Sequence, residues 1–193
     1  MPRPSQETAI LDAALHCFAT MGYDATRIRH IAEAAGVSEG ALYRHYASKE
    51  AVAQALFLHH MQSYVRRLQD IVSDQASVEQ RMREIIAVSL AMYRANPDAI
   101  AFILLERPRL MGALPPDMPY PIALVEALMR EGQSQGVLRS GEPLLLASIF
   151  MGCLLRPIIV SRSGLHAALD LLHDTQHDQV IADAAWAAVT QPQ

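Results

Sequence analysis

Apolar positions recur along this chain at helical spacing, and no run alternates in the manner of a strand. The pattern predicts an all-α protein of about nine helices. Their expected extents, caps included, are 5–21, 26–35, 37–43, 48–72, 77–95, 96–107, 122–135, 142–161 and 176–189, with a further helical segment at 165–172. Five prolines and a glycine in the stretch 108–121 predict a loop there.

Cap and stop residues support these boundaries. Ser5 and Ser48 precede helical patterns as N-caps, and Ser77 with Gln80 forms a capping box. Gly22 ends the first pattern, because glycine readily adopts the left-handed conformation that follows a helix.

Composition narrows the class of protein. The net charge of −4 argues against a surface that coats nucleic acid throughout, so any DNA contact must come from a local patch. Cys17 and Cys153 stand alone, which favours a reducing compartment. The apolar run 144–160 is interrupted by Arg156 and Pro157, and we expect a buried or interface helix rather than a membrane span. The sequence thus predicts a soluble cytoplasmic protein that uses no membrane.

Residues 26–43 fit two short helices joined by a sharp turn. Ala32 is small enough for a close helix crossing, and Gly36 suits the turn. The inward positions are Ile31, Val37 and Leu42. The outward positions of the following helix, which begins with the small residue Ser38, are Glu39, Gly40, Tyr43 and Arg44. This pattern predicts a helix-turn-helix whose second helix enters the major groove of DNA.

Lys49 is the only lysine in the chain, at the first turn of the helix expected from 48. A cation there opposes the helix dipole, so we expect it to bind a DNA phosphate. Residues 1–50 nevertheless carry five basic and six acidic side chains, which predicts modest, salt-sensitive non-specific binding.

The run from Glu7 to Leu56, and most clearly 36–50 (GVSEGALYRHYASKE), resembles the TetR family of bacterial repressors. The resemblance covers about the first quarter of the chain. It implies a three-helix DNA-binding head, assigned here to residues 1–50, and a larger body at 51–193 that binds a small molecule and forms a homodimer.

Carried over by position, the family implies phosphate contacts from Thr26, Tyr43, His45 and Lys49. It implies base-edge contacts from Arg29, Glu39, Gly40 and Ala41. The complete expected DNA-binding set adds Arg27, Ser38 and Arg44, although the family often has Ser or Thr at position 27. Glu39 fits a solvated carboxylate as well as base readout, and Tyr46 fits a core aromatic residue.

Flexible and aromatic side chains in the body suit an apolar ligand cavity, although each also fits an ordinary core. The expected ligand-binding set is Phe57, Met61, Tyr64, Met82, Ile86, Tyr93, Phe102, Met111, Tyr120 and Phe150. Arg94, Glu106, Arg107 and Arg156 fit polar ligand anchors or simple ion pairs. The helices near 142–161 and 176–189 are expected to join two subunits.

No enzyme motif is present, and no cofactor or metal is expected. His173 and His177 stand four residues apart, but no clear third ligand accompanies them. The prediction is therefore a regulator of transcription, expected to be a repressor released from a pseudo-palindromic operator by a small apolar or amphipathic ligand. Two alternatives remain open: an architectural DNA-binding protein without a ligand response, and a helical protein-interaction module. Activation instead of repression also remains open.

Overall fold

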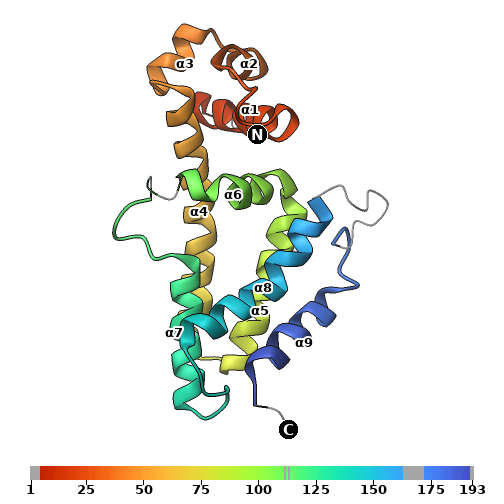
Figure 1. Ribbon diagram of the computed structural model, residues 1–193. Helices are drawn as coiled ribbons and strands as arrows, with labels where there is room; N and C mark the ends of the chain where they lie inside the picture. The colour runs from red at the N-terminus through yellow and green to blue at the C-terminus, as the bar shows by residue number, and fades with distance from the viewer. Residues whose placement is uncertain (1–4, 111, 113, 163–171, 192–193) are drawn as a thin grey trace. The chain divides into compact units, whose positions relative to one another are not determined.

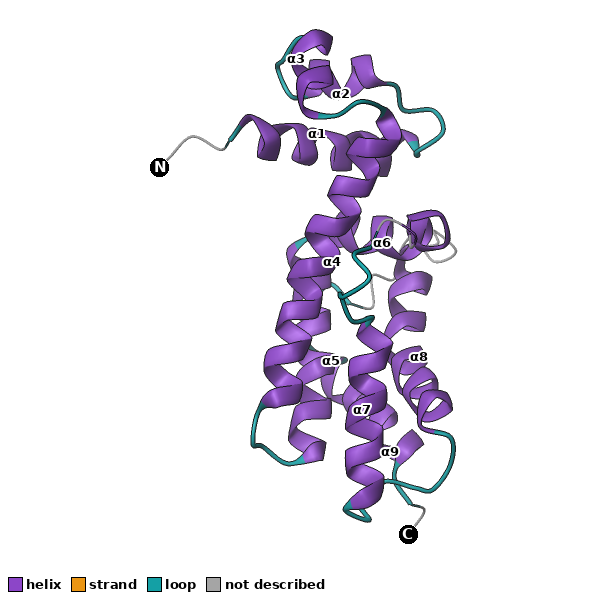
Figure 2. Ribbon diagram, turned by 90° about the vertical axis from the view of Figure 1, so that its left-hand side faces the viewer, coloured by secondary structure: helices purple, strands orange, loops and turns teal. Residues whose placement is uncertain are grey.

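The computed structural model describes residues 5–110, 112, 114–162 and 172–191, and within them the all-helical prediction is confirmed (Figures 1 and 2). These residues form nine α-helices and no strand apart from an isolated bridge between Leu138 and Thr190. The helices are α1 (Gln6–Met21), α2 (Ile28–Ala34), α3 (Glu39–His45), α4 (Lys49–Ser73), α5 (Val78–Ala95), α6 (Pro97–Leu110), α7 (Pro121–Ser134), α8 (Pro143–Arg162) and α9 (Asp178–Val189).

The predicted caps are confirmed. The Ser5 hydroxyl accepts from the Thr8 backbone N–H at 3.2 Å, and the Ser48 hydroxyl accepts from Ala51 N–H at 3.1 Å. Ser77 and Gln80 form the reciprocal capping box at the start of α5. Gly22 ends α1 with a φ of 78°, a conformation that disfavours side chains with a Cβ.

Several helix boundaries differ from the prediction: α3 ends at His45 instead of Tyr43, α9 begins at Asp178 instead of Gln176, and two further differences have a local cause. α2 begins at Ile28 instead of Thr26, because the Thr26 hydroxyl bonds back to the Gly22 carbonyl and so belongs to the preceding loop. α6 continues through Leu110, past the Pro108 at which a loop was expected. A proline past the first turn removes one backbone donor and disfavours the turn before it, but its fixed φ of about −65° is a helical value, so the backbone can continue as a helix. The segment predicted at 165–172 lies outside the described residues, except for Leu172.

The chain divides into two compact units. The first comprises residues 1–62 and 98–115, and the second comprises 63–97 and 116–193. Helix α4 contributes residues to both. The functional boundary was expected at residue 50. The first unit instead extends to residue 62 and also contains α6. The functional boundary itself stays a prediction.

In the first unit, α1 packs on α2 and α2 packs on α3. Ile10, Ile31, Leu42 and Phe57 are completely buried. The ring of Phe102, on α6, stacks on Phe18 of α1 with ring centres 5.5 Å apart and an angle of 8° between the planes. Aromatic and aliphatic packing therefore joins α6 to the helices of the head.

In the second unit, α8 packs against both α7 and α9, and α5 packs against α7, α8 and α9 (Figure 1). The core includes Ile85 and Leu90 of α5 and Phe150 of α8. Among the described helices, α8 is the one long and apolar enough to cross a membrane: residues 143–161 have a mean hydropathy of 2.1, and 33% of them are buried. Length and composition alone do not separate such a span from a helix covered by protein.

Candidate DNA-binding face and ligand-binding body

The helix-turn-helix is built on small residues at its crossing. Ala32 is buried where α2 meets α3, and Gly36 makes the turn with a φ of 66°. The Val37 N–H donates to the Ala32 carbonyl at 2.9 Å, which closes the turn. Ile31 and Leu42 face inward as predicted, whereas Val37 is only half-buried because the turn lies at the edge of the unit.

Most of the expected DNA-binding residues form the exposed side of this unit. Arg27 and Arg29 are exposed at the start of α2. The exposed residues on and before α3 are Ser38, Glu39, Gly40, Tyr43, Arg44 and His45. Tyr43 is 52% exposed, a large fraction for an aromatic side chain. Tyr46, by contrast, is buried as the core interpretation predicted.

Thr26 and Ala41 do not lie on this exposed side. Thr26 is 1% exposed, and its hydroxyl lies 2.7 Å from the Gly22 carbonyl oxygen and 3.2 Å from that of Cys17. Ala41 is 7% exposed and lies on the buried face of α3. The free chain therefore presents neither the Thr26 hydroxyl nor the Ala41 methyl group for the contacts expected of them.

Lys49 lies where the prediction placed it, but its ammonium group is occupied. Nζ donates to the backbone carbonyls of Tyr23 at 2.7 Å, Thr26 at 2.8 Å and Asp24 at 3.3 Å. It also lies 4.3 Å from the centre of the Tyr23 ring, within the range of a cation–π interaction. The backbone carbonyls of the α1–α2 loop therefore satisfy the ammonium group of Lys49 at the N-terminus of α4. The sequence did not predict this contact.

Gly40 occupies a helical position that does not require glycine. A Cβ built there would meet only the Ser38 hydroxyl, at 4.0 Å. Glycine costs a helix about 0.5–1 kcal/mol relative to alanine. A residue that weakens α3 without being needed for packing is consistent with close approach of a partner to the backbone.

The buried Tyr46 connects α3 to α1. Its hydroxyl donates to the Glu7 carboxylate at 3.2 Å. Burial first, and the Glu7 charge second, raise the pKa of Tyr46 to about 12. Tyr46 therefore stays neutral and holds the end of α3 against α1.

The expected ligand-binding residues are divided between the two units. Phe57, Met61 and Phe102 are buried in the first. In the second, the buried members are Met82, Ile86, Tyr93 and Phe150. Tyr120 is exposed at the start of α7, and Met111 lies outside the described residues. The two groups belong to different compact units, and a shared pocket stays a prediction.

The second unit offers polar groups inside its apolar core. The Tyr64 hydroxyl lies 2.9 Å from the hydroxyl of the buried Ser89, and burial raises the pKa of Tyr64. Ile86 also lines a groove of about 370 Å³ between α5 and α9, together with Arg83 and Asp178. Arg94 forms a two-pronged ion pair with Asp178, so of the two interpretations offered for Arg94 the ion pair is confirmed.

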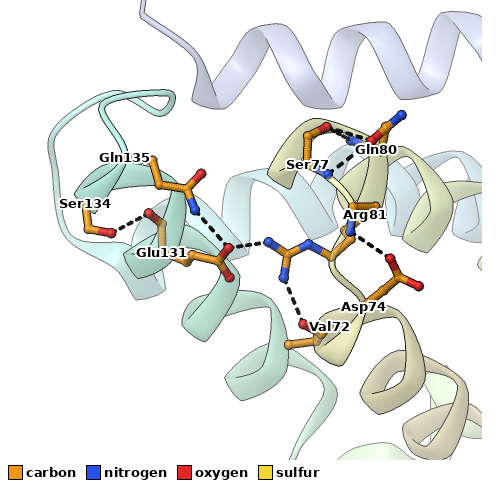
Figure 3. Close-up of polar contacts among 9 residues, drawn as sticks. Val72, Asp74, Ser77, Gln80, Arg81, Glu131, Ser134 and Gln135 are labelled. Atoms are coloured by element: carbon orange, nitrogen blue, oxygen red, sulfur yellow. Dashed lines mark hydrogen bonds and ion pairs between the residues drawn. The ribbon is translucent and has the colours of Figure 1, made fainter.

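A second, polar hollow of about 410 Å³ lies beside the α4–α5 connection. Arg81, which is only 4% exposed, donates there to the Val72 carbonyl at 2.8 Å and pairs with Glu131 of α7 (Figure 3). The Gln135 amide donates to the same Glu131 oxygen at 3.0 Å. These contacts join the end of α4 to α5 and α7. Within the described residues no cluster of His, Cys, Asp and Glu has a geometry that holds a metal.

Comparison with known proteins identifies the class to which this structure belongs. The family described as bacterial regulatory proteins, tetR family, matches residues 10–56. The regulator RutR of Escherichia coli is 32% identical over 151 residues, which cover 76% of this chain and 70% of RutR. The fatty acid metabolism regulator protein of Bacillus subtilis is 22% identical over 142 residues, covering 72% and 73% of the two chains.

Solved structures share the fold. The fatty acid degradation regulator FadR of Bacillus halodurans superposes with a TM-score of 0.77 at 21% identity, over 96% of this chain and 97% of that one. The chain therefore belongs to the TetR family of bacterial regulators. It is a DNA-binding regulator of transcription and not an enzyme.

Proposed function

We propose that this regulator is a repressor that binds a pseudo-palindromic operator as a homodimer and leaves it when a small ligand binds the body. The observation that carries the proposal is the exposed side of α2 and α3, where polar, aromatic and glycine residues gather over a rigid apolar core. Several relatives are named transcriptional repressors, including KstR2 of Rhodococcus jostii, which is 28% identical over 51% of this chain.

The DNA contacts of this proposal come from the exposed residues alone. Arg29 and Glu39 read base edges, and Gly40 allows the α3 backbone to approach the groove floor. Tyr43 and His45 donate to phosphates. Arg27, Ser38 and Arg44 complete the surface. Three further residues support this surface without touching DNA. Lys49 and Thr26 hold the α1–α2 loop, and Ala41 lies on the buried face of α3.

The ligand proposed is apolar or amphipathic. A FadR structure from Bacillus subtilis was solved with stearoyl-CoA, and it superposes on this chain with a TM-score of 0.73 at 16% identity. The apolar interior of the second unit, with the Tyr64 and Ser89 hydroxyls inside it, suits a ligand with a long apolar part and few polar atoms. Such a ligand releases DNA only if it binds the released arrangement better than the DNA-bound one.

The dimer is proposed to form through α8 and α9. Large apolar side chains are exposed there within a single chain: Leu144, Leu145, Ile149, Ile159 and Val180. A second copy would cover them by two-fold symmetry, and it would present two α3 helices to two half-sites. Binding to DNA places the proposed repressor in the cytoplasm.

The test is selection of binding sites from a random duplex DNA library by the full chain. Native protein is expected to enrich a pseudo-palindrome. Tyr43→Ala removes an exposed side chain, so it should fold normally and bind the enriched duplex about tenfold or more weakly. Tyr120→Ala, an exposed tyrosine in the body, is the matched control and should bind like the native chain.

The alternatives give different results in the same experiment. Binding without an enriched sequence would indicate an architectural protein, and enrichment that no small molecule reverses would remove the ligand response. If no duplex is bound, the DNA-reading assignment fails and a protein-interaction module takes its place. If Tyr43→Ala enriches the same sites with unchanged affinity, the assignment of the contact to the exposed face of α3 fails.

A further inference from the structure

Helix α8 presents a stripe of exposed and half-buried residues, called here the α8 stripe, whose chemistry is symmetrical about its middle. Its members are Glu142, Leu145, Ile149, Gly152, Cys153 and Arg156. At about 100° of rotation per residue, all of them fall within about 100° of one helix face. Glu142 belongs to the same helical path, because its carbonyl accepts from the Leu146 N–H at 3.1 Å.

The symmetry of the α8 stripe is centred on Ile149. Leu145 and Cys153 lie four residues from it in opposite directions, and Glu142 and Arg156 lie seven residues from it. The centre is therefore apolar, and the two ends carry opposite charges. An end-to-end reversal of the helix about Ile149 would place apolar residues on apolar residues and each charge on its opposite.

The two charges of the stripe have no ion pair within their own chain. No salt bridge joins Glu142 or Arg156 to another residue that the structure describes. About 21 Å of helix separates the two, so they cannot pair with each other. Both carboxylates of α9 already have partners, since Asp178 pairs with Arg94 and Asp183 pairs with Arg83. On the described parts of α8 and α9, Glu142 is thus the carboxylate left for Arg156.

Arg156 restricts how a second copy can cover this face. A cation that is buried without a carboxylate costs much free energy, so a covered Arg156 needs an opposite charge. A two-fold axis parallel to α8 would place Arg156 against Arg156 of the second copy. An axis perpendicular to α8 at Ile149 makes the two helices antiparallel, and it brings each Arg156 level with Glu142 of the second copy.

We infer that α8 pairs antiparallel with α8 of a second copy, with the two-fold axis at Ile149 and an ion pair between Arg156 and Glu142 of the second copy at each end. Helices that cross at about 20° keep residues seven positions from the crossing within side-chain reach. This inference rests on the proposed function, because it gives the register of the homodimer that the function requires.

Gly152 fits this arrangement. A Cβ built at Gly152 would meet no atom within 4 Å in its own chain, so packing within one copy does not require glycine there. Glycine also weakens a helix relative to alanine. A missing side chain beside the axis lets the backbone of a second helix approach closely.

Disulfide trapping measures the register directly. Cys153 is expected to lie opposite Leu145 of the second copy, with the two copies of Cys153 about 12 Å apart along the helix. A disulfide needs Cα atoms within about 7 Å, so oxidation of the native full chain with copper phenanthroline should give no cross-linked dimer. Cys17 is buried and is present in every variant.

Three variants then define the axis. Leu145→Cys should give a dimer band on a non-reducing gel, and Leu145→Cys/Cys153→Ser should lose it. Ile149→Cys/Cys153→Ser should also cross-link, because Ile149 meets its own copy at the axis. A band from native protein or from Leu145→Cys/Cys153→Ser would overturn the register, and so would the absence of a band from Leu145→Cys.

A charge exchange tests the ion pair. Arg156→Glu and Glu142→Arg should each weaken dimerisation at least tenfold in sedimentation velocity, because each homodimer would contain two pairs of like charges. An equimolar mixture of the two variants should dimerise within about threefold of native, because every heterodimer contains two pairs of opposite charges. A mixture that sediments like the separate variants would show that no such pair forms.

Two controls separate this effect from changes within one chain. Arg67→Glu reverses the charge of an exposed arginine on α4 and should dimerise like the native protein. Glu142→Arg also places a cation at the start of α8, and the resulting loss of stability would persist in the mixture, whereas the inferred loss disappears on mixing. If the native chain is a monomer, the proposed dimer fails first. If it is a dimer that neither charge reversal weakens, only the register fails.

Discussion

Lys49 satisfies three backbone carbonyls of the α1–α2 loop with a single ammonium group. The residues it joins, Tyr23 to Thr26, precede α2, and Lys49 itself begins α4. A carbonyl that loses its donor in a partly buried site retains the cost of its desolvation. The loop that sets the start of α2 therefore depends on one side chain from α4.

Replacing Lys49 by methionine is expected to destabilise the fold. The apolar stem remains, but three hydrogen bonds from a charged donor are lost, which should lower the free energy of unfolding by about 1.5–3 kcal/mol. Urea denaturation followed by circular dichroism measures this change. Native stability combined with weakened DNA binding would instead favour a direct phosphate contact by Lys49.

Gly40→Ala is expected to separate stability from function. The new Cβ meets no close neighbour in the free chain, so α3 should gain about 0.5–1 kcal/mol of stability. The same methyl group lies where we place the groove floor, so operator affinity should fall by about tenfold. Denaturation and anisotropy on one preparation measure both quantities. An affinity that stays native would remove Gly40 from the interface.

At the scale of elements, the Arg81 contacts determine how α4 ends. The buried guanidinium holds the Val72 carbonyl in the last turn of α4 and the Glu131 carboxylate of α7 at the same time (Figure 3). Arg81 side-chain hydrogen bonding lowers the pKa of Glu131 below its ordinary value. A lowered carboxyl pKa means that folding favours the charged form.

The pH dependence of stability follows from the lowered pKa of Glu131. The contribution of Glu131 is fully present above the ordinary glutamate pKa of about 4.3 and is lost as the pH falls through the lowered value. Glu131→Gln keeps an acceptor for Arg81 and removes the charge. Because Glu131 is 38% exposed, solvent screening limits the loss at pH 7 to about 1 kcal/mol or less. Melting curves of both chains should differ at pH 7 and converge as the pH falls through the lowered pKa of Glu131; a constant difference would contradict the assignment.

The helices themselves could be predicted because their signals are local. Ser5, Ser48 and Ser77 cap helices through residues three positions away, and Gly22 supplies its own backbone conformation. The site was harder to predict, because burial depends on partners far along the chain. Thr26 and Ala41 match exposed contact positions by sequence, yet α1 and the helix crossing cover them. His30 closes the first turn of α2 by accepting from the Arg27 backbone N–H at 3.2 Å, and no sequence pattern signals this contact.

At the scale of the whole molecule, the proposed dimer explains why α8 is so apolar. Leu145 is 58% exposed within one chain, and burying apolar area contributes about 25 cal/mol per Å². Several large apolar side chains exposed on two neighbouring helices are uncommon on a monomeric surface. A two-fold partner would bury it.

Leu145→Glu is expected to shift the protein from dimer to monomer, because a carboxylate would have to be desolvated at the centre of the interface. Sedimentation velocity at micromolar concentration measures the change, and operator affinity should fall with it. Val137→Glu carries the same charge at an apolar residue that is 40% exposed outside α8 and α9, and should remain dimeric. A native protein that sediments as a monomer would contradict the proposed assembly.

The occupied ammonium of Lys49 also has a practical consequence for labelling. It is the only lysine of the chain, and three carbonyls hold its protons. Amine-directed dyes and cross-linkers need an accessible, unprotonated amine, so they should react slowly at this position while the head stays folded. A dye attached there would report opening of the α1–α2 loop, and its rate of attachment would measure how often that loop opens.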